Sequence, residues 1–319
     1  MRRVAILDDY QGVALGLADW KSLGADVEVT ALNDHVADED KLARRIGDCE
    51  IAVIMRERTP FPRSLIDKLP NLKLLVTTGM RNRSVDMKAA NERGITVCGT
   101  LSQAAPTYEL TWALIMAIAR QVPLEDRLTR AGAWQRTLGI NLAKKTLGVI
   151  GLGRVGTAIA KIGRAFDMRV IAWSQNLTAA RCAEVGVEFC PSKDELLKQS
   201  DFVTIHLILG PRNRGLIGAR ELGLMKPTSY LVNTSRGPIV DEPALIEALR
   251  QGTIGGAALD VFDVEPLPRD HPLRNMPNTV ITPHIGYVSR DNLEQMYKTA
   301  VDNIRAWMAG KPQNVVLAE

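Results

Sequence analysis

The sequence lacks any long hydrophobic run. Its longest apolar stretch, Leu110–Ala119, is about half of the roughly 20 residues that a membrane-spanning helix needs. This absence argues against a protein built on transmembrane helices. The segment Met1–Leu7 runs directly into Asp8 and Asp9, which leaves no apolar core for a secretory signal. We therefore expect a cytoplasmic protein with no membrane partner.

Cysteine is also scarce, and the charges form no block. The four cysteines stand far apart, without the paired spacing of a zinc site, so we expect reduced thiols, no disulfide and no bound metal. The 40 basic and 36 acidic residues are interspersed and leave a net charge of only +4. This balance gives little support for nucleic-acid binding and suits small anionic ligands.

Short β-branched runs alternate with longer amphipathic stretches, a pattern typical of parallel sheets with helices on both faces. The alternation occurs in two series. The first series predicts strands at Val4–Leu7, Val27–Leu32, Ile51–Met55, Leu72–Thr77 and Ile95–Cys98. The second follows a predicted helix over Tyr108–Arg120, and its six strands are predicted at Thr146–Ile150, Arg169–Trp173, Phe202–His206, Tyr230–Asn233, Gly256–Phe262 and Thr279–Thr282. We therefore predict an α/β protein with two Rossmann-like domains, each a doubly wound parallel sheet.

A glycine-rich turn is the strongest local signal. Gly151, Gly153 and Gly156 follow a predicted strand and open a helix. In such a turn the first glycine permits the bend, the second lets the backbone approach a pyrophosphate, and the third lets helix and strand pack closely. Arg154 and Val155 stand at the start of the helix, whose free N–H groups would face the phosphates. The turn therefore predicts a dinucleotide site, although a merely flexible turn would show the same glycines.

The next strand gives a signal about the cofactor. A site selective for NAD usually has an acidic residue about 20 residues after the glycines, where it binds the ribose hydroxyls. Here the strand ends in Ser174, Gln175 and Asn176. Because no carboxylate would repel a ribose phosphate, we favour NADP, and weakly selective use of NAD remains the alternative.

Polar residues stand at or just beyond the ends of the later strands. They are His206, Thr234, Arg236, Asp260, Glu265 and His284. Ligands of open parallel sheets bind beyond the carboxyl ends of the strands. Each residue alone could be an ordinary loop residue, but an arginine, a glutamate and a histidine from successive strand ends indicate one site.

Only four histidines are available for acid–base chemistry. His35 lies in a charged stretch and His271 in a turn, so we expect both to be solvated. His206 and His284 remain. A carboxylate from Glu265 at a neighbouring strand end would orient the His284 ring and favour its protonated form.

These segments resemble the family of D-isomer-specific 2-hydroxyacid dehydrogenases, and the resemblance covers essentially the whole chain. The matching segments are Gly151–Gly156, Asn233–Gly237, Asp260–Pro266 and Pro283–Gly286. The resemblance implies that Arg236 holds the carboxylate and carbonyl of a small 2-oxo acid. It implies that His284, partnered by Glu265, protonates the carbonyl oxygen as hydride arrives from NAD(P)H. It also implies that the cofactor site includes His206, Thr234, Asp260 and Gly286.

The resemblance further implies the domain organisation. A smaller, flavodoxin-like and discontinuous substrate-binding lid domain would comprise residues 1–102 and 287–319. The dinucleotide-binding domain would comprise residues 103–286 between them. The segment Gln121–Asn141, with Trp134, is similar to the arm through which such proteins form homodimers.

One loop departs from the family pattern. Arg81 stands where the family usually has a glycine, beside Met80 in the loop expected to receive the substrate. With Arg56, it motivates the hypothesis that the substrate carries a second anionic group. The alternative is that these arginines are solvated or pair with Glu57 and Asp86, because exposed ion pairs are weak.

Other functions remain open on the same fold. A non-catalytic, dinucleotide-sensing corepressor-like binding protein would show nucleotide binding without turnover. A formate-type dehydrogenase is disfavoured. In proteins that resemble that type, the residue that partners the histidine is a glutamine, whereas Glu265 is an acid. A purely structural dimer would show no thermal shift with nucleotide.

Overall fold

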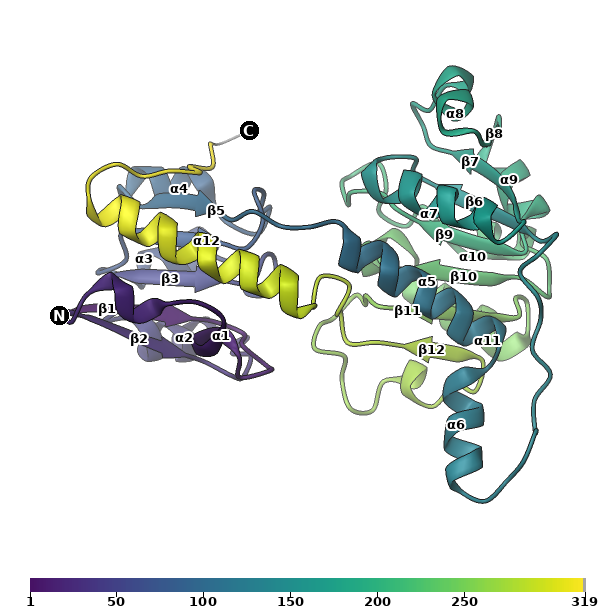
Figure 1. The fold of residues 1–319 in the computed structure, drawn as a ribbon, viewed down its shortest axis with the longest axis horizontal. Coiled ribbons are helices and arrows are strands. Elements are labelled where there is room, and N and C mark those ends of the chain that lie inside the picture. Colours follow the sequence, from purple (N-terminus) through teal and green to yellow (C-terminus); the bar gives the residue numbers. More distant parts are fainter. Residues whose placement is uncertain (318–319) are drawn as a thin grey trace. The chain divides into compact units, whose positions relative to one another are not determined.

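The computed structural model describes residues 1–317, and the chain divides into two compact units. The first unit consists of Met1–Gln103 and Val288–Glu319, and the second of Ala104–Tyr287. Each unit has its own wholly parallel sheet with helices on both faces, as the alternating sequence pattern predicts (Figure 1).

The first unit has a five-stranded sheet in the order β2-β1-β3-β4-β5, which is the flavodoxin-like order. Its strands are β1 Arg2–Ile6, β2 Val27–Ala31, β3 Ile51–Ile54, β4 Leu74–Thr77 and β5 Thr96–Gly99. Its helical elements are α1 Ala14–Leu17, η1 Trp20–Leu23, α2 Glu39–Ile46, α3 Arg63–Asp67, α4 Met87–Glu92 and α12 Arg290–Met308.

The two faces of this sheet are covered by different helices. Helices α2, α3 and α4 pack over one face around a core that includes Leu42, Leu65 and Ala89. The long helix α12 runs across the sheet and contacts β4, η1 and α1 (Figure 1). Helix α12 thus places the carboxyl-terminal segment against the sheet built from the first series of strands.

The second unit has a seven-stranded sheet in the order β12-β11-β10-β9-β6-β7-β8. Its strands are β6 Thr146–Ile150, β7 Arg169–Trp173, β8 Glu188–Phe189, β9 Phe202–Ile205, β10 Tyr230–Asn233, β11 Gly256–Leu259 and β12 Thr279–Ile281. Its helical elements are α5 Ala105–Ala119, α6 Val122–Arg130, α7 Arg154–Ala165, α8 Ala179–Val185, α9 Lys193–Gln199, α10 Ala219–Leu224, η2 Gly237–Ile239, α11 Glu242–Gln251 and η3 Pro272–Arg274.

The strand order reverses beside β6, between its neighbours β7 and β9. This is the arrangement of a dinucleotide-binding sheet, in which ligands bind at the point of reversal. The prediction of six strands was one short, because the two-residue edge strand β8 pairs with β7 without any period of its own.

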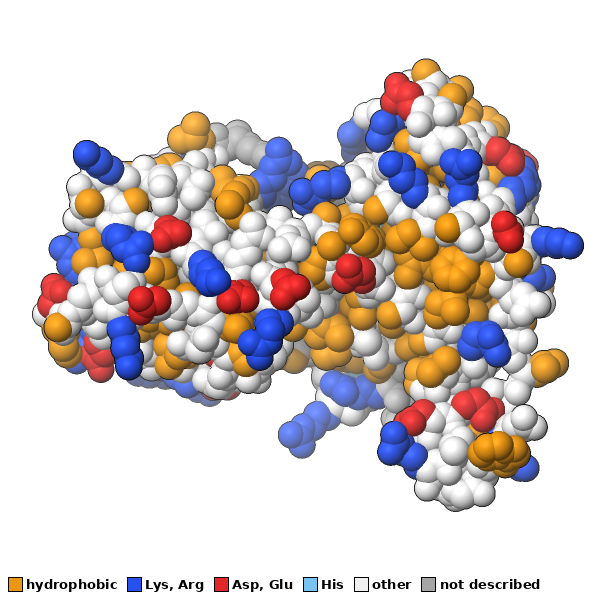
Figure 2. Space-filling view, in the orientation of Figure 1, with side chains coloured by type: hydrophobic (Ala, Val, Ile, Leu, Met, Phe, Trp, Pro, Cys, Tyr) orange, Lys and Arg blue, Asp and Glu red, His pale blue; other side chains and the backbone are white. Residues whose placement is uncertain are grey.

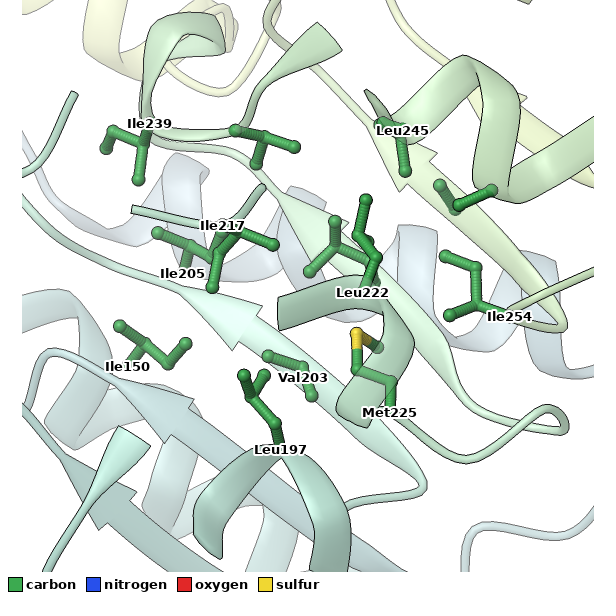
Figure 3. Packing of buried hydrophobic residues seen from close by; sticks show 14 of the residues in the cluster. Ile150, Leu197, Val203, Ile205, Ile217, Leu222, Met225, Ile239, Leu245 and Ile254 are labelled. Atoms are coloured by element: carbon green, nitrogen blue, oxygen red, sulfur yellow. The ribbon is translucent and has the colours of Figure 1, made fainter. Parts of the chain in front are cut away.

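The interior of the second unit follows from the alternation of side chains along its strands. Val203 and Ile205 of β9 face one core, where α9, α10 and α11 supply Leu197, Leu222 and Leu245 (Figure 3). On the opposite face, other strand residues pack against α5, α7 and α8. This double burial fixes the carboxyl ends of the strands, from which the polar residues project.

The four cysteines are buried and unpaired. Within residues 1–317, no helix combines the length and the apolar character needed to cross a bilayer. No cluster of three potential metal ligands occurs in that described part of the chain.

Candidate active site

The glycine turn lies between β6 and α7 at the reversal point of the second sheet. Gly151 has a φ of +100°, and a Cβ there would lie 2.5 Å from the carbonyl oxygen of His206. A Cβ on Gly156 would lie 1.9 Å from the Gly151 carbonyl oxygen, whereas a Cβ on Gly153 would have no atom within 4 Å. The packing of the turn therefore requires Gly151 and Gly156, whereas Gly153 leaves the backbone open to an incoming group. This pattern fits a bound pyrophosphate.

The start of α7 provides donors for such a group. Its first residue is Arg154, and the N-cap residue Gly153 has no side chain that could bond the first N–H groups. The first N–H groups of a helix have no intrahelical partner and carry partial positive charge, which favours an anion. The turn and helix together therefore suit the phosphates of a dinucleotide.

The residues after β7 lie at the edge of this region. Ser174 is half-buried, and Gln175 and Asn176 are exposed. Arg181 of α8 reaches back to the hydroxyl of Thr157 in α7, with an Nη2–Oγ1 distance of 3.3 Å, and also pairs with Glu184. A guanidinium thus lies near the segment where a ribose phosphate would be expected.

Arg236 projects from a closely packed loop after β10. The carbonyl of Arg236 accepts a hydrogen bond from Asn233 at 2.9 Å, and its Nη1 donates to the Ser235 carbonyl at 2.7 Å. A Cβ on the next residue, Gly237, would lie 2.1 Å from the carbonyl carbon of Phe262. The loop of Arg236 therefore presses directly against the loop that carries Glu265.

Glu265 and His284 form the central contact of the site. The Oε2 atom of Glu265 lies 2.5 Å from Nδ1 of His284, and its Oε1 accepts the Phe262 N–H at 3.0 Å. Both side chains are largely buried, with 19% and 21% exposure. One carboxylate thus joins the two strand ends.

Asp260 holds the backbone around His284. Its carboxylate accepts hydrogen bonds from the Thr282 hydroxyl at 2.6 Å and from the N–H groups of Ile285 and Gly286 at 2.8 Å each. These bonds fix the turn in which His284 takes a φ of +55°, a conformation that side chains seldom adopt. Burial has the largest influence on the Asp260 carboxyl and raises its pKa.

The other histidines differ from one another. Burial lowers the pKa of His206 to about 3, and its Nε2 lies 2.9 Å from the Thr204 hydroxyl, so the ring is neutral. The expectation that His35 and His271 are solvated was wrong. His35 is 2.9 Å from the buried Asp8, and His271 lies 3.1 Å from an acid, Glu242. Neither partner is adjacent in sequence, which is why the charge pattern did not reveal them.

The predicted substrate residues of the first unit lie on the loops after β3 and β4, which are hydrogen-bonded to each other. Arg56 donates its N–H to the Thr78 hydroxyl at 3.1 Å, and its carbonyl accepts from Asn82 at 2.7 Å. Arg56 also lies 3.6 Å from Glu57, the partner that the alternative interpretation named. Met80 packs over the backbone of β5, because a Cβ on Gly99 would lie 2.8 Å from its Cα.

Comparison with known proteins places these features in one family. The model for the NAD binding domain of D-isomer specific 2-hydroxyacid dehydrogenases matches residues 112–286. A glyoxylate reductase from Aeropyrum pernix is 42% identical over 268 residues, covering 80% of this chain and 79% of that protein. The chain belongs to this family.

Further relatives extend the similarity along the chain. A hydroxypyruvate reductase from Blautia hydrogenotrophica is 31% identical and covers 98% of this chain and 99% of its own. The structure of a phosphoglycerate oxidoreductase from Vibrio cholerae is 35% identical, with a TM-score of 0.92, 97% of this chain covered and 100% of that one.

Membership decides between the functions that the sequence left open. This 2-hydroxyacid dehydrogenase is an oxidoreductase that transfers hydride between a nicotinamide dinucleotide and a small 2-oxo or D-2-hydroxy acid. The catalytic interpretation is therefore supported over the corepressor-like one. The geometry agrees with this activity, since a carboxylate-backed imidazole and a guanidinium stand at adjoining strand ends.

Proposed function

We propose that Arg236, Glu265 and His284 are the catalytic residues of this dehydrogenase. The observation that carries the proposal is the 2.5 Å contact between Glu265 Oε2 and His284 Nδ1. A carboxylate on one ring nitrogen fixes the orientation of the imidazole. The other ring nitrogen can then give a proton to a substrate.

The roles follow from the charge that develops during reduction. A reduced nicotinamide held at the glycine turn would supply the hydride for the carbonyl carbon of the 2-oxo acid. The carbonyl oxygen gains negative charge, and His284 donates its Nε2 proton to that oxygen. Arg236 binds the substrate carboxylate and carbonyl through its planar guanidinium. Glu265 holds the ring through its contact with Nδ1 before and after the transfer.

The test is a screen of glyoxylate, hydroxypyruvate, oxaloacetate and bulkier 2-oxo acids with NADH and NADPH, following loss of the reduced nicotinamide. We expect turnover in the wild type and its loss in His284→Ala, with nucleotide binding retained in both proteins. Activity that survives this substitution undiminished with every substrate would refute the catalytic assignment.

The cofactor contacts that we propose follow the reversal point of the second sheet. The residues are Gly151, Gly153, Arg154, Val155, Gly156, Ser174, Gln175, Asn176, His206, Thr234, Asp260 and Gly286. The absence of an acid after β7, together with the nearby guanidinium of Arg181, supports NADP over NAD. We expect Arg181→Ala to raise the KM for NADPH about tenfold, because one charge-assisted hydrogen bond to the cofactor would be lost. The KM for NADH should stay unchanged. Equal effects on both cofactors would refute the preference.

The substrate contacts proposed in the first unit are Arg56, Met80 and Arg81, and we propose that the substrate carries a second anionic group. The hydrogen bonds that fix the Arg56 backbone to the neighbouring loop support a built, cationic binding region. We expect Arg81→Ala to lower kcat/KM for oxaloacetate about tenfold relative to glyoxylate. Arg83→Ala, an exposed arginine in the same loop, is the control. An unchanged ranking of mono- and dicarboxylates would refute this part.

We also propose a homodimer formed through the segment 121–141. Trp134 and Leu138 are 75% and 96% exposed, and hydrophobic side chains gather on the face that carries α5 and on the α6 segment (Figure 2). Such patches are typical of protein interfaces. Leu138→Glu should convert a dimer to a monomer in analytical ultracentrifugation, while Phe189→Ala, at the edge strand β8, should not. The buried, unpaired cysteines support a cytoplasmic location.

A further inference from the structure

The loop that carries Glu265 is attached at two points to a second acid outside the catalytic set. Glu242 is the first residue of α11, directly after the N-cap Asp241. Its Oε2 accepts the N–H of Asp263 at 3.3 Å, and its Oε1 lies 3.1 Å from Nε2 of His271. Asp263 stands at the start of the loop and His271 at its end. The carboxylate of Glu242 therefore connects the start of this loop to its end.

The hydrogen-bond roles within this cluster are defined. Nδ1 of His271 accepts the N–H of Leu273 at 3.4 Å, so the ring proton is on Nε2 and is donated to Glu242. The side chains of Glu242 and His271 are each only 15% exposed. Burial, and after it the carboxylate of Glu242, raises the pKa of the Asp263 carboxyl. Glu242 is thus the acceptor of both hydrogen bonds, and its contact with His271 is mostly shielded from water.

The consequence for the active site runs through the backbone. Asp263 immediately follows Phe262, whose N–H binds the carboxylate of Glu265. A shift of the peptide between these residues would turn the Glu265 carboxylate relative to His284. Misplacement of a catalytic group by about 1 Å can cost about 100-fold in rate.

We propose that Glu242, held by His271, is a positioning residue that keeps Glu265 directed at Nδ1 of His284. This inference rests on the proposed roles of Glu265 and His284. Its structural alternative is that Glu242 only stabilises the start of α11, as acids in a first helical turn do.

The experiment compares Glu242→Ala and His271→Asn with Glu247→Ala, an exposed acid of the same helix. Asparagine at 271 can still cap η3 but releases Glu242. We expect Glu242→Ala to lower kcat about 10- to 100-fold without a matching change in the KM for the 2-oxo acid. His271→Asn should do the same to a smaller extent, and it decides the question if Glu242→Ala does not fold. The control should keep the wild-type kcat.

Two readouts separate positioning from helix stability. The Nδ1–H proton of His284, bound to Glu265, should give a low-field proton resonance in the wild type and the control, and the two test variants should weaken it. In a Glu265→Gln background, Glu242→Ala should cause little further loss of kcat, since it acts through Glu265. A folded test variant with wild-type kcat and resonance would overturn the proposal, as would equal losses in both backgrounds. If the wild type lacks turnover, the proposed function fails, and the resonance alone still tests the role of Glu242.

Discussion

Replacing the carboxylate of Glu265 should lower the rate of reduction. The contact with His284 Nδ1 is 2.5 Å, and each side chain is about one-fifth exposed, at 19% and 21%. The carboxylate holds the ring in one orientation, and misplacement of a catalytic group by about 1 Å can cost about 100-fold in rate. Glutamine keeps the size of the side chain but holds the ring less firmly, so we expect a loss of about 10- to 100-fold in kcat/KM for Glu265→Gln.

The assay is kcat/KM for 2-oxo acid reduction from pH 5 to pH 9. Glu265→Gln should lose activity by this factor across the range, because the proposed proton donor His284 is no longer held in one orientation. Oxidation of the hydroxy acid would use the same ring, so its rate should fall by a similar factor. A variant whose two profiles coincide with the wild type would refute the reasoning.

Other predictions test the cofactor turn and the stability of the second unit. Gly153→Ala should leave the melting temperature unchanged and weaken NAD(P)H binding, measured by fluorescence titration. Gly156→Ala should lower the melting temperature, because a Cβ would clash at Gly156 and not at Gly153. Glu221 lies 3.0 Å from Lys193, with 12% and 17% exposure. Lys193→Met should lower the free energy of unfolding by about 1–3 kcal/mol in urea titrations. Lys193 and the N–H of Gly218 outweigh burial and lower the pKa of Glu221 below its ordinary 4.5, so this stabilisation should be present above that pH and be lost as the pH falls through the lowered value. A stability difference between wild type and variant that persists to pH 2 would contradict this.

Much of the fold could be predicted because it depends on local periodicity. The strands Thr146–Ile150, Arg169–Trp173 and Tyr230–Asn233 have the predicted bounds, since each is a buried apolar run bounded by polar residues. Most of the other predicted strands were longer than the observed ones, whereas the first was predicted at Val4–Leu7 and is observed at Arg2–Ile6. Gly256–Phe262, for example, ends as a strand at Leu259, because the residues beyond it leave the sheet to form the loop of Glu265.

The site could be predicted only where strand order brings residues together. Glu265 and His284 follow neighbouring parallel strands, so their approach could be expected from topology. The contacts of His35 with Asp8 and of His271 with Glu242 join residues 27 and 29 positions apart. Such pairs depend on how loops fold over one another, and no local pattern in the sequence records that.

The left-handed backbone at His284 bears on the choice of an inactive form of the enzyme. The three hydrogen bonds of Asp260 dictate that conformation independently of the imidazole. Asparagine enters this region of backbone space more easily than most residues, whereas a β-branched side chain would resist it. His284→Asn is therefore the replacement best suited to capturing the intact substrate together with its coenzyme, because it would remove the proposed proton donor with the least strain in the surrounding backbone.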